Sequence, residues 1–327
     1  MDEQELTAVV AAPGRGPVWW RALAAPLGPK VSAGRAYVEV VTVFGAFFGT
    51  GVADALLSLA GRLQSDTGTA SWSAYGPAAF DDLAQAGLAV AVVYLLSRRR
   101  GCPPAALGLR LRRDGRGRIR GWSEVRLAAA ALLALIVGAV ITSALETGGI
   151  SSGTTSAASL LYRSAHAMEA GFLEECVVLA FVVATLRQAR RPLPEIVAVA
   201  LVLRVSYHLY YGPGAIGIAV WALAFIWLFL RTQSLIPLIA VHCAWDLVAT
   251  FGPHWPAVTG LALLVTLTLF AVAVISWLVE RIHDDRKASP SPLAPPAGWY
   301  PDPWGDRAWR WWNGWAWTSE VSRARTA

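Results

Sequence analysis

Five side chains that can exchange protons lie inside apolar stretches of this sequence. Glu174 and Glu175 are neighbours in one stretch, His208 ends a second, and His242 and Asp246 share a third. An ionisable group at membrane depth costs at least about 2.5–3.5 kcal/mol, so it indicates a functional site by default. We therefore take these five residues as the candidate catalytic set.

These residue types are suited to hydrolysis. A carboxylate can act as a general base on water, and an imidazole can orient that water or donate to an oxyanion. Two histidines and two carboxylates could also hold a divalent metal such as zinc, and the expected ligands are then Glu175, His208 and His242. The helical His-Glu-x-x-His zinc motif is absent. The sequence therefore predicts hydrolysis by an activated water, with a metal or without one.

Helical spacing would bring these side chains into one layer. Arg204 and His208 are four residues apart and share a helix face, as do His242 and Asp246. The two adjacent glutamates point about 100° apart, yet both can border one cavity. We expect a glutamate carboxylate within about 4–8 Å of an imidazole, because proton transfer needs hydrogen-bond or single-water reach.

The composition predicts the elements that position this set. The chain has 327 residues, of which 55% are hydrophobic and 15% charged, whereas about a quarter of a soluble domain is charged. The apolar residues form runs near the ~20 residues that a helix needs to cross a bilayer. We expect an all-α polytopic membrane protein with about eight transmembrane helices, at residues 36–60, 79–97, 125–146, 167–186, 193–211, 214–230, 234–251 and 257–279.

The polar motifs resemble those of a known family. A Glu-Glu pair in one span, a His ending the next span, and His-x-x-x-Asn/Asp two spans later are the signature of the CPBP intramembrane endopeptidases. This family includes the CAAX prenyl proteases and the bacteriocin-processing and immunity proteins. The resemblance covers about residues 168–250. It implies an eight-helix membrane protease in which Glu174 or Glu175 activates water, while His208, His242 and Asp246 position the water and stabilise the oxyanion.

The sequence departs from the family pattern at two positions. The family has Arg five residues after the first glutamate, where this chain has Leu179, and Phe four residues before the first His, where this chain has Arg204. We expect compensation, in which Arg204 supports the site by pairing with Glu174 or Glu175. The alternative is drift in a protein that has lost peptidase activity.

Basic residues gather in alternate loops. Nine arginines lie within residues 98–120, and smaller basic clusters precede the first span and follow the fourth, sixth and eighth spans. Eight alternating spans place these clusters on one side, so the positive-inside rule predicts a multi-pass cell-membrane protein with both termini in the cytoplasm and the site toward the outer face. Anionic lipid head groups account for the basic loop, so no nucleic-acid partner is expected.

Composition also divides the chain into four regions. Residues 1–35 are expected to be a cytoplasmic segment with an interfacial helix, 36–280 the transmembrane protease-like domain, 281–296 a Pro/Ser-rich linker and 297–321 a small module. The module holds seven of the sixteen tryptophans, and its Asn-Gly predicts a type I′ turn between two aromatic strands. It resembles a Trp-rich module appended to bacterial membrane proteins, whose role is not established. Such a tail could dock on a protein partner or the membrane surface.

The remaining acidic residues of the spans are not expected to be catalytic. Asp81 and Asp82 are expected near a helix N-terminus, where anions are stabilised. Glu39, Asp54 and Glu146 are expected to be interfacial or helix-packing residues.

Three functions fit these observations. The first is an intramembrane endopeptidase that acts on a peptide or membrane-anchored protein. The second is a catalytically inactive family member that serves as an immunity factor or membrane scaffold. The third is a proton-coupled transporter, because carboxylate and histidine clusters also form proton relays. Transport is disfavoured because the sequence has no internal repeat and no paired broken helices.

Overall fold

The computed structural model describes residues 27–61, 72–109, 121–146, 156–288, 295–304 and 309–322. Within these ranges the chain forms eight long or medium helical segments and one small antiparallel sheet, which confirms the expected fold class. Five helices are long and apolar enough to cross a membrane. The chain divides into two compact units, residues 1–270 and 271–327, which are described separately.

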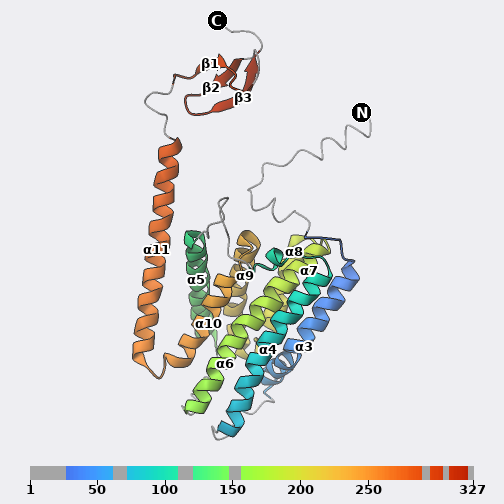
Figure 1. The fold of residues 1–327 in the computed structure, drawn as a ribbon. Helices are drawn as coiled ribbons and strands as arrows, with labels where there is room; N and C mark the ends of the chain where they lie inside the picture. The colour runs from blue at the N-terminus through green and yellow to red at the C-terminus, as the bar shows by residue number, and fades with distance from the viewer. Residues whose placement is uncertain are drawn as a thin grey trace. The chain divides into compact units, whose positions relative to one another are not determined.

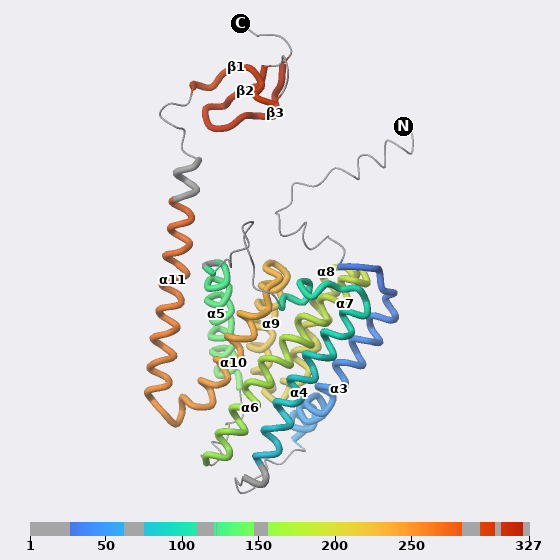
Figure 2. Tube along the Cα trace, in the orientation of Figure 1, coloured from blue at the N-terminus to red at the C-terminus, as the bar shows by residue number. Residues whose placement is uncertain are grey.

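The two glutamates of the candidate site lie on the continuation of helix α6 (Ala157–Leu173). Helix α6 continues through the π-helix η2 (Glu174–Phe181) into α7 (Val182–Gln188), and packs between α4 (Trp72–Arg99) and α10 (Ile236–Phe251) (Figures 1 and 2). The remaining helical elements are α3 (Ala33–Leu59), η1 (Pro104–Leu107), α5 (Gly121–Leu145), α8 (Leu193–Ser206), the 3₁₀ segment η3 (Leu209–Gly214), α9 (Ala215–Thr232) and α11 (Pro256–Ala288).

Two of the expected spans that carry candidate site residues differ in length from the observed helices. The fourth begins ten residues before the predicted 167, since a capping box between Ser156 and Ser159 starts α6 in a more polar stretch that the apolar pattern excluded. The fifth, predicted to reach residue 211, ends at Ser206. Gly212 then has a φ of 56° and Pro213 follows it, so the helix does not continue. As a result, His208 lies just beyond the C-terminus of a short helix.

The basic loops meet at one end of the helical bundle. The side-chain amide of Gln188 donates to the carbonyls of Pro29 and Arg100, at 3.1 and 2.8 Å. The Arg100 guanidinium bonds Glu39 and Thr185, both at 2.9 Å. These contacts join the start of α3, the end of α4 and the end of α7. The packing role expected for Glu39 is therefore confirmed.

Close helix packing depends on small residues. A Cβ at Gly171 of α6 would overlap Sγ of Cys243 in α10 and lie 3.0 Å from its backbone nitrogen. A Cβ at Gly217 of α9 would lie 2.6 Å from the backbone nitrogen of Thr142 in α5. Small residues at such positions let membrane helices approach closely. Gly171 thus sets the distance between the two helices that carry the glutamates and His242.

The C-terminal unit contains a three-stranded sheet with β2 (Trp309–Trp312) between β1 (Gly298–Pro301) and β3 (Trp317–Ser322). The expected hairpin between aromatic strands is present, but the type I′ turn was wrong, since Gly314 has a positive φ and Asn313 does not. The Asn313 side-chain oxygen instead accepts from the backbone nitrogens of Trp315 and Ala316, which closes a longer loop.

Side chains stabilise this small sheet. Arg310 of β2 donates to both carboxylate oxygens of Asp302, each at 3.0 Å, and to the carbonyl of Thr318 at 2.8 Å. The Arg310 hydrogen bonds hold the pKa of the Asp302 carboxyl below its usual value. The rings of Trp312 and Trp317 meet edge to face at 5.3 Å. An ion pair and edge-to-face aromatic contacts thus replace a large core.

The close approach of α6 and α10 can be tested with glycine substitutions. We expect Gly171→Ala to cost about 1–3 kcal/mol through overpacking and to move His242 away from Glu175. Gly87→Ala is the matched control, because a Cβ at Gly87 of α4 meets no heavy atom within 4 Å. Thermal unfolding of the purified protein in detergent measures the difference, and equal melting temperatures for the two variants would contradict the packing argument.

Candidate active site

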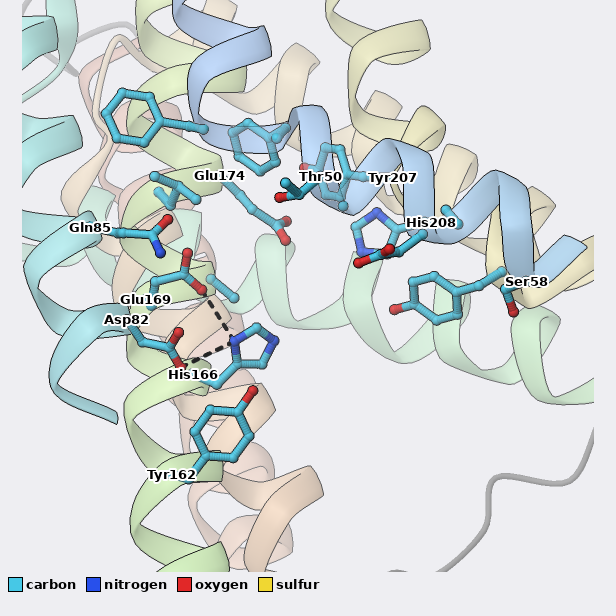
Figure 3. A pocket seen from close by; sticks show the side chains of 18 residues that line it. Thr50, Ser58, Asp82, Gln85, Tyr162, His166, Glu169, Glu174, Tyr207 and His208 are labelled. Carbon is cyan, nitrogen blue, oxygen red and sulfur yellow. Dashed lines mark ion pairs between the residues drawn. The ribbon is translucent and has the colours of Figure 1, made fainter. Parts of the chain in front are cut away.

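The sequence-predicted residues converge on two neighbouring cavities. A cavity of about 610 Å³ is lined by Glu174, Tyr207 and His208, among others (Figure 3). A second, of about 350 Å³, is also lined by Glu174 and His208, and adds His242 and Asp246. The glutamates begin the π-helix η2, an insertion that widens one helical turn and often marks functional sites.

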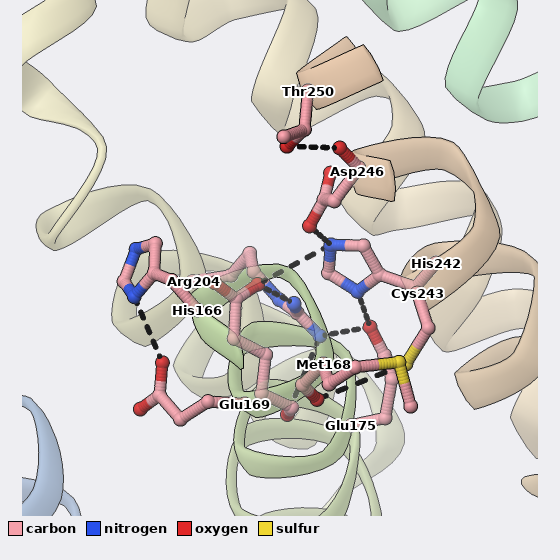
Figure 4. A network of polar contacts seen from close by, with 10 residues as sticks. His166, Met168, Glu169, Glu175, Arg204, His242, Cys243, Asp246 and Thr250 are labelled. Carbon is pink, nitrogen blue, oxygen red and sulfur yellow. Dashed lines mark hydrogen bonds and ion pairs between the residues drawn. The ribbon is translucent and has the colours of Figure 1, made fainter. Parts of the chain in front are cut away.

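Arg204 is the centre of the polar network (Figure 4). Its guanidinium forms an ion pair with Glu174 and donates to Glu175 Oε1 at 3.0 Å. It also lies 4.9 Å from the ring centroid of Trp221, a cation–π distance. Arg204 is only 2% exposed. The sequence predicted that Arg204 pairs with Glu174 or Glu175, and in the structure it pairs with both.

His242 lies beside the same two glutamates. Its Nδ1 is 2.8 Å from Glu175 Oε1, and its Nε2 is 3.9 Å from Glu174 Oε2 and 3.5 Å from Asp246 Oδ2. Both glutamate carboxylates thus lie close enough to the His242 imidazole for proton transfer, as the sequence predicted. Asp246 lies one turn further along α10 and completes a chain of acid, imidazole and acid.

His208 joins this arrangement through the backbone. Its Nδ1 donates to the carbonyl of Arg204 at 3.0 Å, one of the carbonyls that the end of α8 leaves without a helical partner. Its ring also packs against Tyr207, with ring centroids 4.5 Å apart. With the proton on Nδ1, Nε2 of the neutral imidazole is an acceptor, and His208 shares both cavities with Glu174.

The glutamates differ in their access to the cavities. Glu175 is fully buried and contributes to the walls of neither cavity, while its Oε2 has no hydrogen-bond partner in the described structure. Glu174 borders both cavities. Sequence spacing could not separate the two roles, because the local path of the π-helix decides which carboxylate meets the open space.

The metal set expected from sequence does not form. Ligand atoms of Glu174, Glu175 and His242 lie within 4.8 Å of one another, and His208 is not a member of this group. A divalent cation does not fit here, because the Arg204 guanidinium already binds both carboxylates and would repel it. We therefore derive no step through a metal at these residues.

Sequence reasoning missed two residues on the cavity wall. His166 lies one residue before the predicted fourth span and Glu169 lies inside it. Their separation by three residues on one helix was the available signal. The sequence analysis was also wrong about Asp82, which it placed near a helix N-terminus. Helix α4 begins at Trp72, about 15 Å away at ~1.5 Å per residue, so the helix N-terminus does not account for this carboxylate.

A single and a double variant test whether Arg204 takes the place of the arginine expected at position 179. Arg204→Phe should cost about 3–5 kcal/mol, because it leaves two buried carboxylates without their cation. Leu179→Arg in the same chain should recover part of this loss, since position 179 lies one turn after Glu175 on the same helix. Thermal unfolding in detergent compares the single and double variants. If both lose the same stability, the two positions do not compensate.

The comparison with protein families agrees with these observations. Residues 156–248 match the family described as type II CAAX prenyl endopeptidase Rce1-like, and residues 297–327 match a protein family of unknown function, DUF2510. No match to the chain was found among curated proteins or solved structures. The first match includes all the sequence-predicted site residues, namely Glu174, Glu175, Arg204, His208, His242 and Asp246. The chain therefore carries a domain of the Rce1-like CAAX protease family, followed by a C-terminal module of unknown function.

Proposed function

We propose that this protein is an intramembrane endopeptidase in which Glu174 activates the attacking water. The Rce1-like domain supports protease activity in the membrane in general. The finer assignment rests on one observation: Glu174 is the glutamate that borders both cavities, whereas Glu175 is fully buried. Only a carboxylate with access to the cavity can take a proton from a water beside the substrate.

The other residues have supporting roles in this mechanism. Glu175 holds His242 through Nδ1 at 2.8 Å, so Nε2 faces the cavity that Asp246 and Glu174 line. When protonated, His242 donates from Nε2 to the oxyanion. The acceptor Nε2 of His208 takes a hydrogen bond from the attacking water.

The reaction then proceeds in two proton transfers. Glu174 takes a proton from water as the water oxygen attacks the scissile carbonyl carbon, and the carbonyl electrons move to its oxygen. The tetrahedral intermediate collapses as the carbon–nitrogen bond breaks, and Glu174 returns the proton to the leaving amine. The ion pair with Arg204 holds the Glu174 carboxylate in position before it takes the proton and again after it returns the proton.

The substrate class follows from the location of the site. A peptide or membrane-anchored protein would enter the cavities laterally from the bilayer, with lipids as the surrounding partners. If the basic end of the bundle faces the cytoplasm, as the positive-inside rule predicts, the cavities lie toward the outer half of the membrane. A cytosolic prenylated substrate is therefore not proposed for this chain.

The assignment of Glu174 can be tested by substitution. Glu174→Gln should reduce cleavage at least about 100-fold, because general-base catalysis contributes ~10²–10⁴-fold. Glu175→Gln should retain more activity, because its amide oxygen still accepts from His242 Nδ1. The readout is the set of new protein N-termini in membranes of cells that make each variant at equal levels. Asp54→Asn is the control, since it lines the larger cavity outside the polar network.

A family member without peptidase activity is the second candidate, and one observation favours it. Arg204 forms an ion pair with Glu174, and this pair is weakened whenever Glu174 takes a proton. An immunity factor or membrane scaffold needs the fold and not the proton transfer. Identical N-termini for wild type and Glu174→Gln, with a phenotype on loss of the whole protein, would establish this reading instead.

A further inference from the structure

A second polar cluster lies on the wall of the larger cavity. His166 and Glu169 come from α6 and Asp82 from α4, and the ligand atoms of all three lie within 4.8 Å of one another (Figure 3). The proposed mechanism uses none of these residues. Within the described structure they form no ion pair with Arg204, although Figure 4 draws His166 and Glu169 beside it, so the guanidinium that neutralises Glu174 and Glu175 does not neutralise them.

The two nitrogen–oxygen distances in this cluster are compatible with metal coordination. His166 Nδ1 is 3.3 Å from Glu169 Oε2 and 3.5 Å from Asp82 Oδ2. A charged N–H···O bond is normally about 2.7–2.9 Å. Ligands that bind zinc at about 2.0–2.2 Å in a tetrahedron lie about 3.3–3.6 Å apart. One imidazole nitrogen thus faces two carboxylate oxygens at the spacing of neighbouring ligands.

The cluster also holds a polar atom with no hydrogen bond. Asp82 Oδ2 is buried and has no hydrogen-bond partner in the described structure, although His166 Nδ1 is its near neighbour. A buried acceptor without a partner costs about 1–3 kcal/mol, and more when it is charged. A cation among the three residues would remove this cost.

The charge of the cavity favours a cation as well. Among the described residues that line it are four carboxylates and no Lys or Arg. Glu174 has its counter-ion in Arg204, whereas the basic partner that Asp82 and Glu169 have in the described part of the chain is His166. The His166 side chain is 60% exposed, so an ion in the cavity can reach its nitrogen.

We propose that Asp82, His166 and Glu169 bind a divalent metal cation of the zinc class. Two carboxylate oxygens and one imidazole nitrogen are ligands that zinc accepts, and three protein ligands leave one coordination position open. That position faces the cavity that Glu174 and His208 also line. The metal would stabilise the packing of α4 on α6 and offer the cavity a site for an oxygen ligand. This inference does not depend on peptidase activity.

Metal binding by the full-length protein in detergent tests the proposal. The protein is stripped with a chelator, and zinc chloride is titrated in with calorimetry and elemental analysis as readouts. We expect one zinc ion per chain. Asp82→Asn, His166→Gln and Glu169→Gln should each weaken binding by at least about 100-fold, since loss of even an outer-shell partner costs ~10–100-fold.

Two control variants locate the ion. Asp54→Asn lies in the same cavity outside the cluster, and Glu174→Gln/Glu175→Gln removes the other group of carboxylates. Both should retain one zinc ion with wild-type affinity. The proposal is overturned if the wild-type chain binds no stoichiometric zinc, because His166 is then a protonated partner of the two acids. It is overturned equally if the Glu174→Gln/Glu175→Gln chain still unfolds cooperatively in detergent but has lost zinc, since the ion then belongs to the Arg204 network.

Discussion

The ion pair of one arginine with two adjacent glutamates organises the membrane-embedded part of this protein. Moving a charged group out of water costs several kcal/mol even after relaxation, and the cost is recovered only when each charge has close partners. Arg204 satisfies this condition through Glu174 and Glu175 together, and Trp221 covers its guanidinium. The position of α8 relative to the continuation of α6 must therefore be kept, because the arginine and the two glutamates stay buried only while they are paired.

Irregular backbone is concentrated around this ion pair. The π-helix begins at Glu174, and α8 ends two residues after Arg204. Breaks in helical hydrogen bonding at membrane depth need compensation, and His208 provides it by donating to the carbonyl of Arg204. The same deviations turn Glu174 toward the cavities and leave Glu175 behind it. The π-helix and the early end of α8 thus accompany the difference between the cavity-facing Glu174 and the buried Glu175.

Two clusters on the same helix solve the problem of buried acids in different ways. In the first, a guanidinium provides the charge and excludes a metal from the carboxylates. In the second, an imidazole faces Asp82 and Glu169 at distances that leave room for an ion. Both clusters border the larger cavity. The Arg204 guanidinium would then be a fixed positive charge beside Glu174, and the proposed metal ion would be an exchangeable positive charge in the same cavity.

The sequence by itself determined the class of fold and the location of the polar network. Apolar runs indicate membrane helices because backbone groups in lipid must bond internally, and charged residues inside such runs must find partners, so the pairing of Arg204 was predictable. Helix ends were not, because capping at Ser156 and the break at Gly212 override the hydropathy pattern. His166 was left outside the predicted fourth span for that reason. Only the tertiary structure decided which glutamate borders the cavity and brought Asp82 to His166, because both depend on how helices distant in sequence pack against each other.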